Sequence, residues 1–178
     1  MKIDGTAFDD VVGNSYTGIS DKTTLSFTTG DTTVPTLTST TPSDNATVIA
    51  VDSSIVLNFS EAVDVETGNI VIYKTSDNSE VESIDVTSNQ VTGSGTSQIT
   101  IDPSVTLEST TEYYVKIDAT AFDDPSSNSY AGINDTTTLS FTTGDTTAPI
   151  LSTSIPLDNA TAVAEGSNIV LTFNEVVD

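Results

Sequence analysis

The sequence predicts an all-β fold, an antiparallel β-sandwich built in tandem repeats of 114 residues. Three observations lead to this prediction. Apolar and polar residues alternate with a period of two, which is typical of strands that bury one face. Runs rich in Gly, Pro, Asn and Asp separate the alternating runs, and long stretches of sequence recur at one constant offset. No window shows a capped amphipathic helix, and Thr120–Phe122 offers at most one short turn.

The recurrence involves both ends of the chain. The stretch "KIDGTAFDD" at Lys2–Asp10 returns as "KIDATAFDD" at Lys116–Asp124, an offset of 114 residues. At the same offset, residues 1–64 align with residues 115–178 without a gap, with 41 identities in 64 positions. The chain is therefore expected to be a segment of a longer tandem array of similar domains.

This repeat predicts three parts. Residues 1–30 form the C-terminal part of a preceding repeat, residues 31–144 form one complete repeat, and residues 145–178 form the N-terminal part of a following repeat. The nearly identical stretches "FTTGDTTVP" and "FTTGDTTAP" are the junctions, each consisting of an exit strand, a short linker and the proline that starts the next repeat.

Within the complete repeat, alternating runs predict about seven strands, and turn signals separate them. The clearest runs are Ile55–Ser60, Ile99–Ile101, Tyr113–Asp118 and Leu139–Phe141. Tyr113 opens its strand a few residues after Leu107 and a polar turn, which is the sequence form of a tyrosine corner. An ordinary core aromatic is the alternative interpretation of this residue.

The charge of the chain excludes several classes of partner. Twenty-six acidic residues face four lysines, with no arginine or histidine, which gives a net charge of −22. We expect no nucleic-acid partner, because phosphate neutralisation requires a Lys/Arg patch, and no membrane insertion, because no run approaches the roughly 20 apolar residues that span a bilayer. The first ten residues lack the apolar region of a signal peptide. A chain this acidic either stays solvated or collects hard cations such as calcium.

Catalysis is not expected. The chain has no histidine and no cysteine, so the usual general base, the thiolate nucleophile and the common transition-metal ligands are missing. Pairs of carboxylates exist, such as Asp123 with Asp124 and Glu61 with Asp64. They sit in repeated segments, and we find neither a nucleophile–base pair nor oxyanion donors beside them. The prediction is a protein that is not an enzyme.

Three sequence motifs resemble one known family. They are the opening "DTTVP", the strand ending "FSEAV" and the closing "AFDDPSSNSYAGINDTTTLSFTTG". The chain resembles the bacterial Ig-like domain family (Big_5, or SbsA Ig-like) over the complete repeat and both partial ones. This resemblance implies an Ig-like sandwich in an exported bacterial protein, extracellular or on the cell surface, such as an adhesin or an S-layer component. It implies no single activity, because function belongs to sites rather than folds.

Acidic residues are expected to gather at one pole of the sandwich. In an Ig-like sandwich the incoming chain, the loop after the second strand and the loop after the tyrosine-corner strand share a pole. Calcium binds six to eight oxygens from carboxylates, carbonyls and water. We predict a junctional Ca²⁺ site made by Asp31, Glu61, Asp123 and Asp124, with Asp64 and Asn128 as further, outer ligands. The alternative is a set of solvated turn residues, because no ligand-spaced loop of the EF-hand kind is present.

The predicted function is that of a non-catalytic structural spacer. Its partners would be neighbouring Ig-like repeats of the same chain or array, and other copies in a filament or surface layer. One alternative is an adhesive module that recognises a glycan or a protein, with Tyr73, Tyr114 and Tyr130 as candidate contacts. Another is a self-assembling extracellular filament formed by strand complementation between partial domains, although neither end of the chain supplies the equivalent of residues 65–114.

Overall fold

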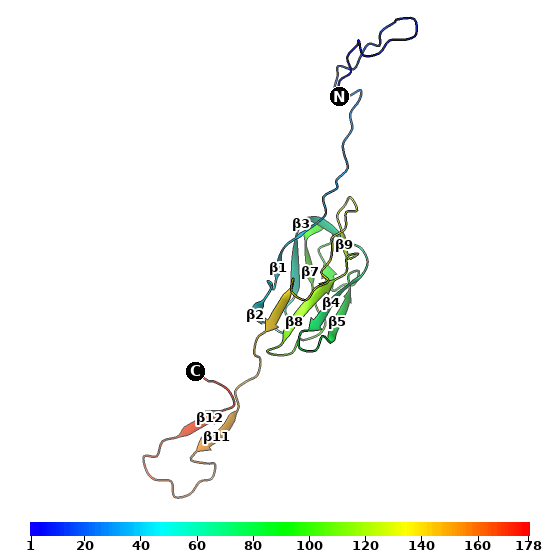
Figure 1. Ribbon diagram of the computed structural model, residues 1–178. Helices are drawn as coiled ribbons and strands as arrows, with labels where there is room; N and C mark the ends of the chain where they lie inside the picture. The colour runs from blue at the N-terminus through cyan, green and yellow to red at the C-terminus, as the bar shows by residue number, and fades with distance from the viewer. The chain divides into compact units, whose positions relative to one another are not determined.

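The computed structural model describes residues 1–178 and is built from strands, turns and loops (Figure 1). It contains no helix that is long and apolar enough to cross a membrane. Its contacts divide the chain into two units, Met1–Thr33 and Val34–Asp178. The strands are β1 (Leu37–Thr41), β2 (Ala46–Ile49), β3 (Ile55–Val65), β4 (Asn69–Lys74), β5 (Glu80–Asp85), β6 (Val91–Thr92), β7 (Thr96–Ile101), β8 (Glu112–Ile117), β9 (Phe122–Asp123), β10 (Ser140–Thr143), β11 (Leu151–Ile155) and β12 (Val170–Phe173).

Strands β1 to β10 form a sandwich of two sheets (Figure 1). One sheet has the order β1-β3-β7-β6, with β9 paired to β3, and the other has the order β2-β10-β8-β4-β5. All pairings are antiparallel except that of β10 with β2, which is parallel. The all-β sandwich predicted from the sequence is therefore confirmed.

The core lies between the two sheets and follows the alternation of the sequence. Along β3, Ile55, Leu57 and Phe59 are buried, whereas the residues between them are more exposed. This is expected because successive side chains of a strand point to opposite faces. The second sheet contributes buried residues from β4, β8 and β10, and loop residues close the ends. The largest fully buried side chains are Tyr113, Phe122, Ile55, Leu57, Ile70, Ile72, Ile84, Ile99, Ile101, Leu139, Val63 and Val86.

The tyrosine corner predicted at Tyr113 is present. The backbone N–H of Glu108 donates a hydrogen bond to the Tyr113 hydroxyl, with an N···O distance of 2.8 Å. The Tyr113 side chain is buried and its ring lies 6.0 Å from that of Phe141, centroid to centroid. The residue is therefore both a core aromatic and a tie between β8 and the loop before it.

The sequence prediction ended the second strand too early. It stopped at Ser60, but β3 continues to Val65, so Glu61 and Asp64 lie on the strand and not in a following loop. The strand changes register against β7 between Asn58 and Val63 and then pairs with β9. The polar residues after Phe59 look like the end of a strand, yet Val63 returns to the core.

Local structure recurs at the repeat offset. β11 pairs with β12 in the same register as β1 with the middle of β3, including an irregularity at the same place. In the N-terminal unit, bridges join Ile3 to Ile19 and Asp9 to Ser15; their counterparts 114 residues later join Ile117 to Ile133 and Asp123 to Ser129. Short-range sequence therefore determines these segments.

Candidate functional site

Three of the predicted metal ligands lie together. Carboxylate oxygens of Asp31, Glu61 and Asp124 are all within 4.8 Å of one another. Glu61 comes from β3 and is partly buried, and Asp124 follows β9 and is only 3% exposed. Oxygen ligands from separate segments are the type of arrangement that hard cations such as Ca²⁺ use.

Asp124 is held in place by the loop that it begins. Its Oδ1 accepts hydrogen bonds from the backbone N–H groups of Ser126 and Asn128, both at 2.8 Å, and its Oδ2 accepts one from Asn128 Nδ2 at 2.8 Å. The side-chain hydrogen bond from Asn128 is the main reason that the pKa of Asp124 is lowered. A carboxylate has about four lone-pair sites, so these three bonds leave about one for a cation. Asn128 thus contacts Asp124 directly and orients it.

Asp64 and Asp123 lie outside this group of three. They are paired residues across the β3–β9 ladder, and Ser94 Oγ lies 3.5 Å from Asp64 Oδ1. The prediction placed both residues in loops, and the extension of β3 moves them onto strands. They flank the group formed by Asp31, Glu61 and Asp124 along the chain, but they do not complete it.

A second acidic pair occurs one repeat later. Asp145 and Glu175 stand 114 residues after Asp31 and Glu61. Hydrogen bonds lower the pKa of Asp145, first from the backbone N–H of Thr147 and, more weakly, from the Ser109 hydroxyl. Glu175 Oε1 is buried and has no hydrogen-bond donor. The sequence prediction left Glu175 out, although the repeat offset from Glu61 points to it.

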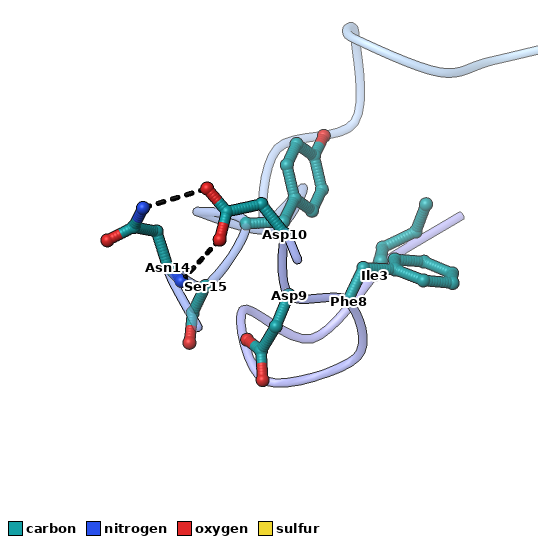
Figure 2. Close-up of a pocket in the computed structure, with 7 residues that line it drawn as sticks. Ile3, Phe8, Asp9, Asp10, Asn14 and Ser15 are labelled. Carbon is teal, nitrogen blue, oxygen red and sulfur yellow. Dashed lines mark hydrogen bonds between the residues drawn. The ribbon is translucent and has the colours of Figure 1, made fainter. Parts of the chain in front are cut away.

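The loop around Asp124 has a copy in the N-terminal unit, where it borders a pocket (Figure 2). Asp10 accepts hydrogen bonds from the backbone N–H of Asn14 at 2.8 Å and from its Nδ2 at 2.7 Å, as the dashed lines show. The conformation of this loop is therefore stabilised by hydrogen bonds within the loop, and the orientation of Asp10 or Asp124 does not require a metal ion. The pocket is lined by Ile3, Phe8, Asp9, Asp10, Asn14, Ser15 and Tyr16.

The equivalent residues of the complete repeat explain the pocket in the N-terminal unit. The counterparts of Phe8 and Tyr16 are Phe122 and Tyr130, which are 0% and 6% exposed, whereas Phe8 and Tyr16 are 62% and 42% exposed. In the sandwich, the ring of Phe59 lies 5.5 Å from that of Phe122 and 5.1 Å from that of Tyr130. The N-terminal pocket thus corresponds to the core position of Phe59 and is not a ligand site of the complete domain.

The chemistry of Asp124 suits cation binding better than proton transfer. A general acid or base that works near neutral pH requires a carboxyl pKa raised towards that pH. The pKa of Asp124 moves in the opposite direction, because hydrogen-bond donors stabilise the ionised form. The carboxylate is therefore permanently charged under ordinary conditions.

Comparison with known proteins identifies the family. The sequence profile of the bacterial Ig-like domain (Big_5) matches residues 31–143 and 145–178. No curated protein matches the chain. Among solved structures, CopC from Methylosinus trichosporium OB3b is 20% identical, with a TM-score of 0.46 over 64% of this chain and 97% of that one. The S-layer protein rSbsC(31-844) is 19% identical, with a TM-score of 0.40 over 67% of this chain and 15% of that one. On the profile match, which spans most of its length, the chain belongs to the bacterial Ig-like domain family.

Proposed function

We propose that this protein is a non-catalytic structural spacer of an exported bacterial surface protein, in which Ig-like repeats follow one another and provide length. The observation that carries this proposal is the repetition of strand register and loop bridges at an offset of 114 residues. Membership of a bacterial Ig-like domain family supports it. The proposed location is the cell surface or the extracellular space, and the proposed partners are neighbouring repeats and other copies in a surface layer.

We further propose that calcium stiffens the junctions between repeats. Asp31, Glu61 and Asp124 would supply the central ligands, with Asp64, Asp123 and Asn128 around them. At 4 Å, two unit charges repel by about 1 kcal/mol even in bulk water, and more where the dielectric constant is lower. Three carboxylates within 4.8 Å of one another therefore repel, and a bound cation would reduce this repulsion. The recurrence of the acidic pair at Asp145 and Glu175 supports a role at every junction.

Calcium titration tests this part of the proposal. Isothermal titration of Ca²⁺ into the whole chain should give a saturable heat, and the melting temperature should fall on addition of EDTA. A ligand present at 100 times its Kd stabilises the folded state by about 2.7 kcal/mol, which is readily seen in a melt. Glu61→Gln should weaken binding at least tenfold, whereas Asp52→Asn, which removes an exposed charge outside the group, should not. If no heat and no change in melting temperature appear, calcium stiffening is wrong.

A separate measurement tests stiffness itself. The chain has no cysteine, so Ser20→Cys and Ser83→Cys would allow two spin labels to be attached at defined places. The distribution of distances between the labels should be narrower with calcium than with EDTA. An equally broad distribution in both conditions would leave calcium binding without the proposed mechanical role.

A second candidate function is an adhesive module. One observation favours it: the rings of Tyr73 and Tyr114 are stacked with centroids 5.1 Å apart, and Lys116 Nζ lies 5.8 and 5.9 Å from them. Aromatic residues are enriched at recognition surfaces. Tyr114 is only 4% exposed, so a ligand would contact mainly Tyr73 and Lys116, which are partly buried. A glycan array and a pull-down with the whole chain separate the two functions. A specific ligand that is lost on Tyr73→Ala would favour the adhesive module over the spacer.

A further inference from the structure

The short linker that leaves the sandwich is attached to the loop between β7 and β8. Ser109 Oγ donates a hydrogen bond to Asp145 Oδ1, with an O···O distance of 3.2 Å, and accepts one from the backbone N–H of Thr146 at 3.0 Å. A hydroxyl group has one donor and two acceptor sites, so it can make both bonds at once. One side chain of the sandwich thus holds two consecutive linker residues.

The backbone on both sides of Ser109 is also tied to the exit strand. The N–H of Thr110 donates to the carbonyl of Gly144 at 3.2 Å, and the N–H of Thr143 donates to the carbonyl of Thr111 at 3.0 Å. The buried Thr143 hydroxyl donates to the carbonyl of Glu108 at 2.6 Å. These bonds hold Ser109 at a fixed place beside the point where the chain leaves the sandwich.

The tyrosine corner anchors this loop to the core. The Glu108 N–H is bonded to the buried Tyr113 hydroxyl, and the N–H of Leu107 donates to the carbonyl of Val51 at 2.8 Å. Glu108 Oε2 also pairs with Lys74 Nζ at 2.6 Å on the surface. The base from which Ser109 projects is therefore connected to both β8 and the segment before β3, and it does not depend on the linker for its position.

We propose that Ser109 and Asp145 form a latch that fixes the direction in which the linker leaves the sandwich, and so orients the repeat that follows. Asp145 is held from both sides, because it accepts hydrogen bonds from the Ser109 hydroxyl in the sandwich and from the backbone N–H of Thr147 in the linker, the latter at 2.8 Å. Asp31 occupies the same position in the preceding linker, so the acceptor of the latch recurs with the repeat. This inference rests on the spacer function, since an orienting latch serves a protein that transmits direction along an array.

The test measures the order of the linker backbone in the whole chain. Nitrogen-15 relaxation, recorded in EDTA, should give an order parameter near 0.85 for the N–H of Thr146, the value of a rigid backbone. In Ser109→Ala this value should fall below about 0.6, the range of flexible segments. Ser76→Ala, which removes an exposed hydroxyl from the turn after β4, is the matched control and should leave Thr146 unchanged.

A second variant acts from the linker side. Asp145→Ala lies outside the sandwich strands, so it should loosen Thr146 while the chemical shifts of β3 and β8 stay the same. The proposal of a latch is wrong if the backbone N–H of Thr146 is already flexible in the unmodified chain, or if it stays rigid in both variants. Because these measurements contain no calcium, a failure of the latch is distinguishable from a failure of calcium stiffening.

Discussion

The hydroxyl of Tyr113 provides the most direct test of how this sandwich is held together. Tyr113→Phe removes one oxygen atom and keeps the ring that packs 6.0 Å from Phe141, so the core stays filled. The change leaves the Glu108 N–H, now bonded to that hydroxyl at 2.8 Å, without its partner. A net hydrogen bond contributes about 0.5–1.5 kcal/mol, and an unsatisfied buried donor costs about 1–3 kcal/mol.

We expect Tyr113→Phe to reduce the free energy of unfolding by about 1–2 kcal/mol, near the low end of that penalty because Glu108 itself is exposed to water. For a domain of this size, that loss corresponds to a melting temperature lower by roughly 4–8 °C. Urea denaturation followed by circular dichroism measures the first quantity, and calorimetry the second.

Tyr130→Phe is the matched control for this experiment. It is the same chemical change in another buried tyrosine, one that takes no part in the tyrosine corner. Its effect should stay within about 0.5 kcal/mol. If the two variants lose the same stability, the hydroxyl of the tyrosine corner contributes nothing beyond its ring, and the expected stabilisation is wrong.

Two further predictions concern the loop after β9 and the response to acid. Gly132→Ala should lower the free energy of unfolding of the sandwich by about 2–5 kcal/mol, measured in urea melts. Gly132 has a φ of +74°, and an added Cβ would lie 2.4 Å from the carbonyl oxygen of Ile117. A loss below about 1 kcal/mol would contradict this prediction. Hydrogen bonds from the backbone of Thr137 and from Thr138 lower the pKa of Asp135 from 3.8 to about 2. Stability from this carboxylate is therefore complete above about pH 4 and lost as the pH falls towards 2, and Asp135→Asn should flatten that part of a stability-against-pH curve; an unchanged curve would contradict the assignment.

Much of the fold is predictable because burial alternates along its long strands. The run around Leu57 buries every second residue from Ile55 to Phe59, and that pattern is visible in the letters alone; in the run around Val115, Tyr114 is buried as well as its neighbours. The shortest strands carry no such signal. β2 has only four residues, and its partner β10 begins about 90 residues later, so its pairing depends on contacts that no local window contains. β6 and β9 have two residues each and exist only because a longer neighbour extends past them.

The sequence predicts part of the candidate site, because an Ig-like sandwich brings certain loops and the incoming chain to the same pole. Asp31, Glu61 and Asp124 lie together, as expected for segments that reach the same pole. The positions of Asp64 and Asp123 were wrong, because the glutamate at position 61 interrupts the apolar alternation and hides the continuation of β3 to Val65. Whether these residues bind calcium stays a prediction, since the letters specify charge and place but not occupancy.

The parallel contact of β2 with β10 has a consequence for synthesis. The N–H and Oγ of Ser140 both donate to Asp44 Oδ1, at 3.0 and 2.9 Å, across 96 residues. Such distant contacts form late, after the loop between them has closed. The ribosome, however, makes the identical letters "LSFTTG" at Leu25–Gly30 before it makes those at Leu139–Gly144.

Nascent β2 is therefore synthesised after the exit strand of the previous repeat and before its own partner, β10. Exchange of a strand between similar neighbours is a characteristic failure of repeat proteins during folding. The hairpin of β1 with β3 needs only nearby residues and can form first, which places β2 within its own domain before the competing strand is captured. In such an array, rapid formation of that hairpin would favour pairing of strands within one repeat over pairing between repeats.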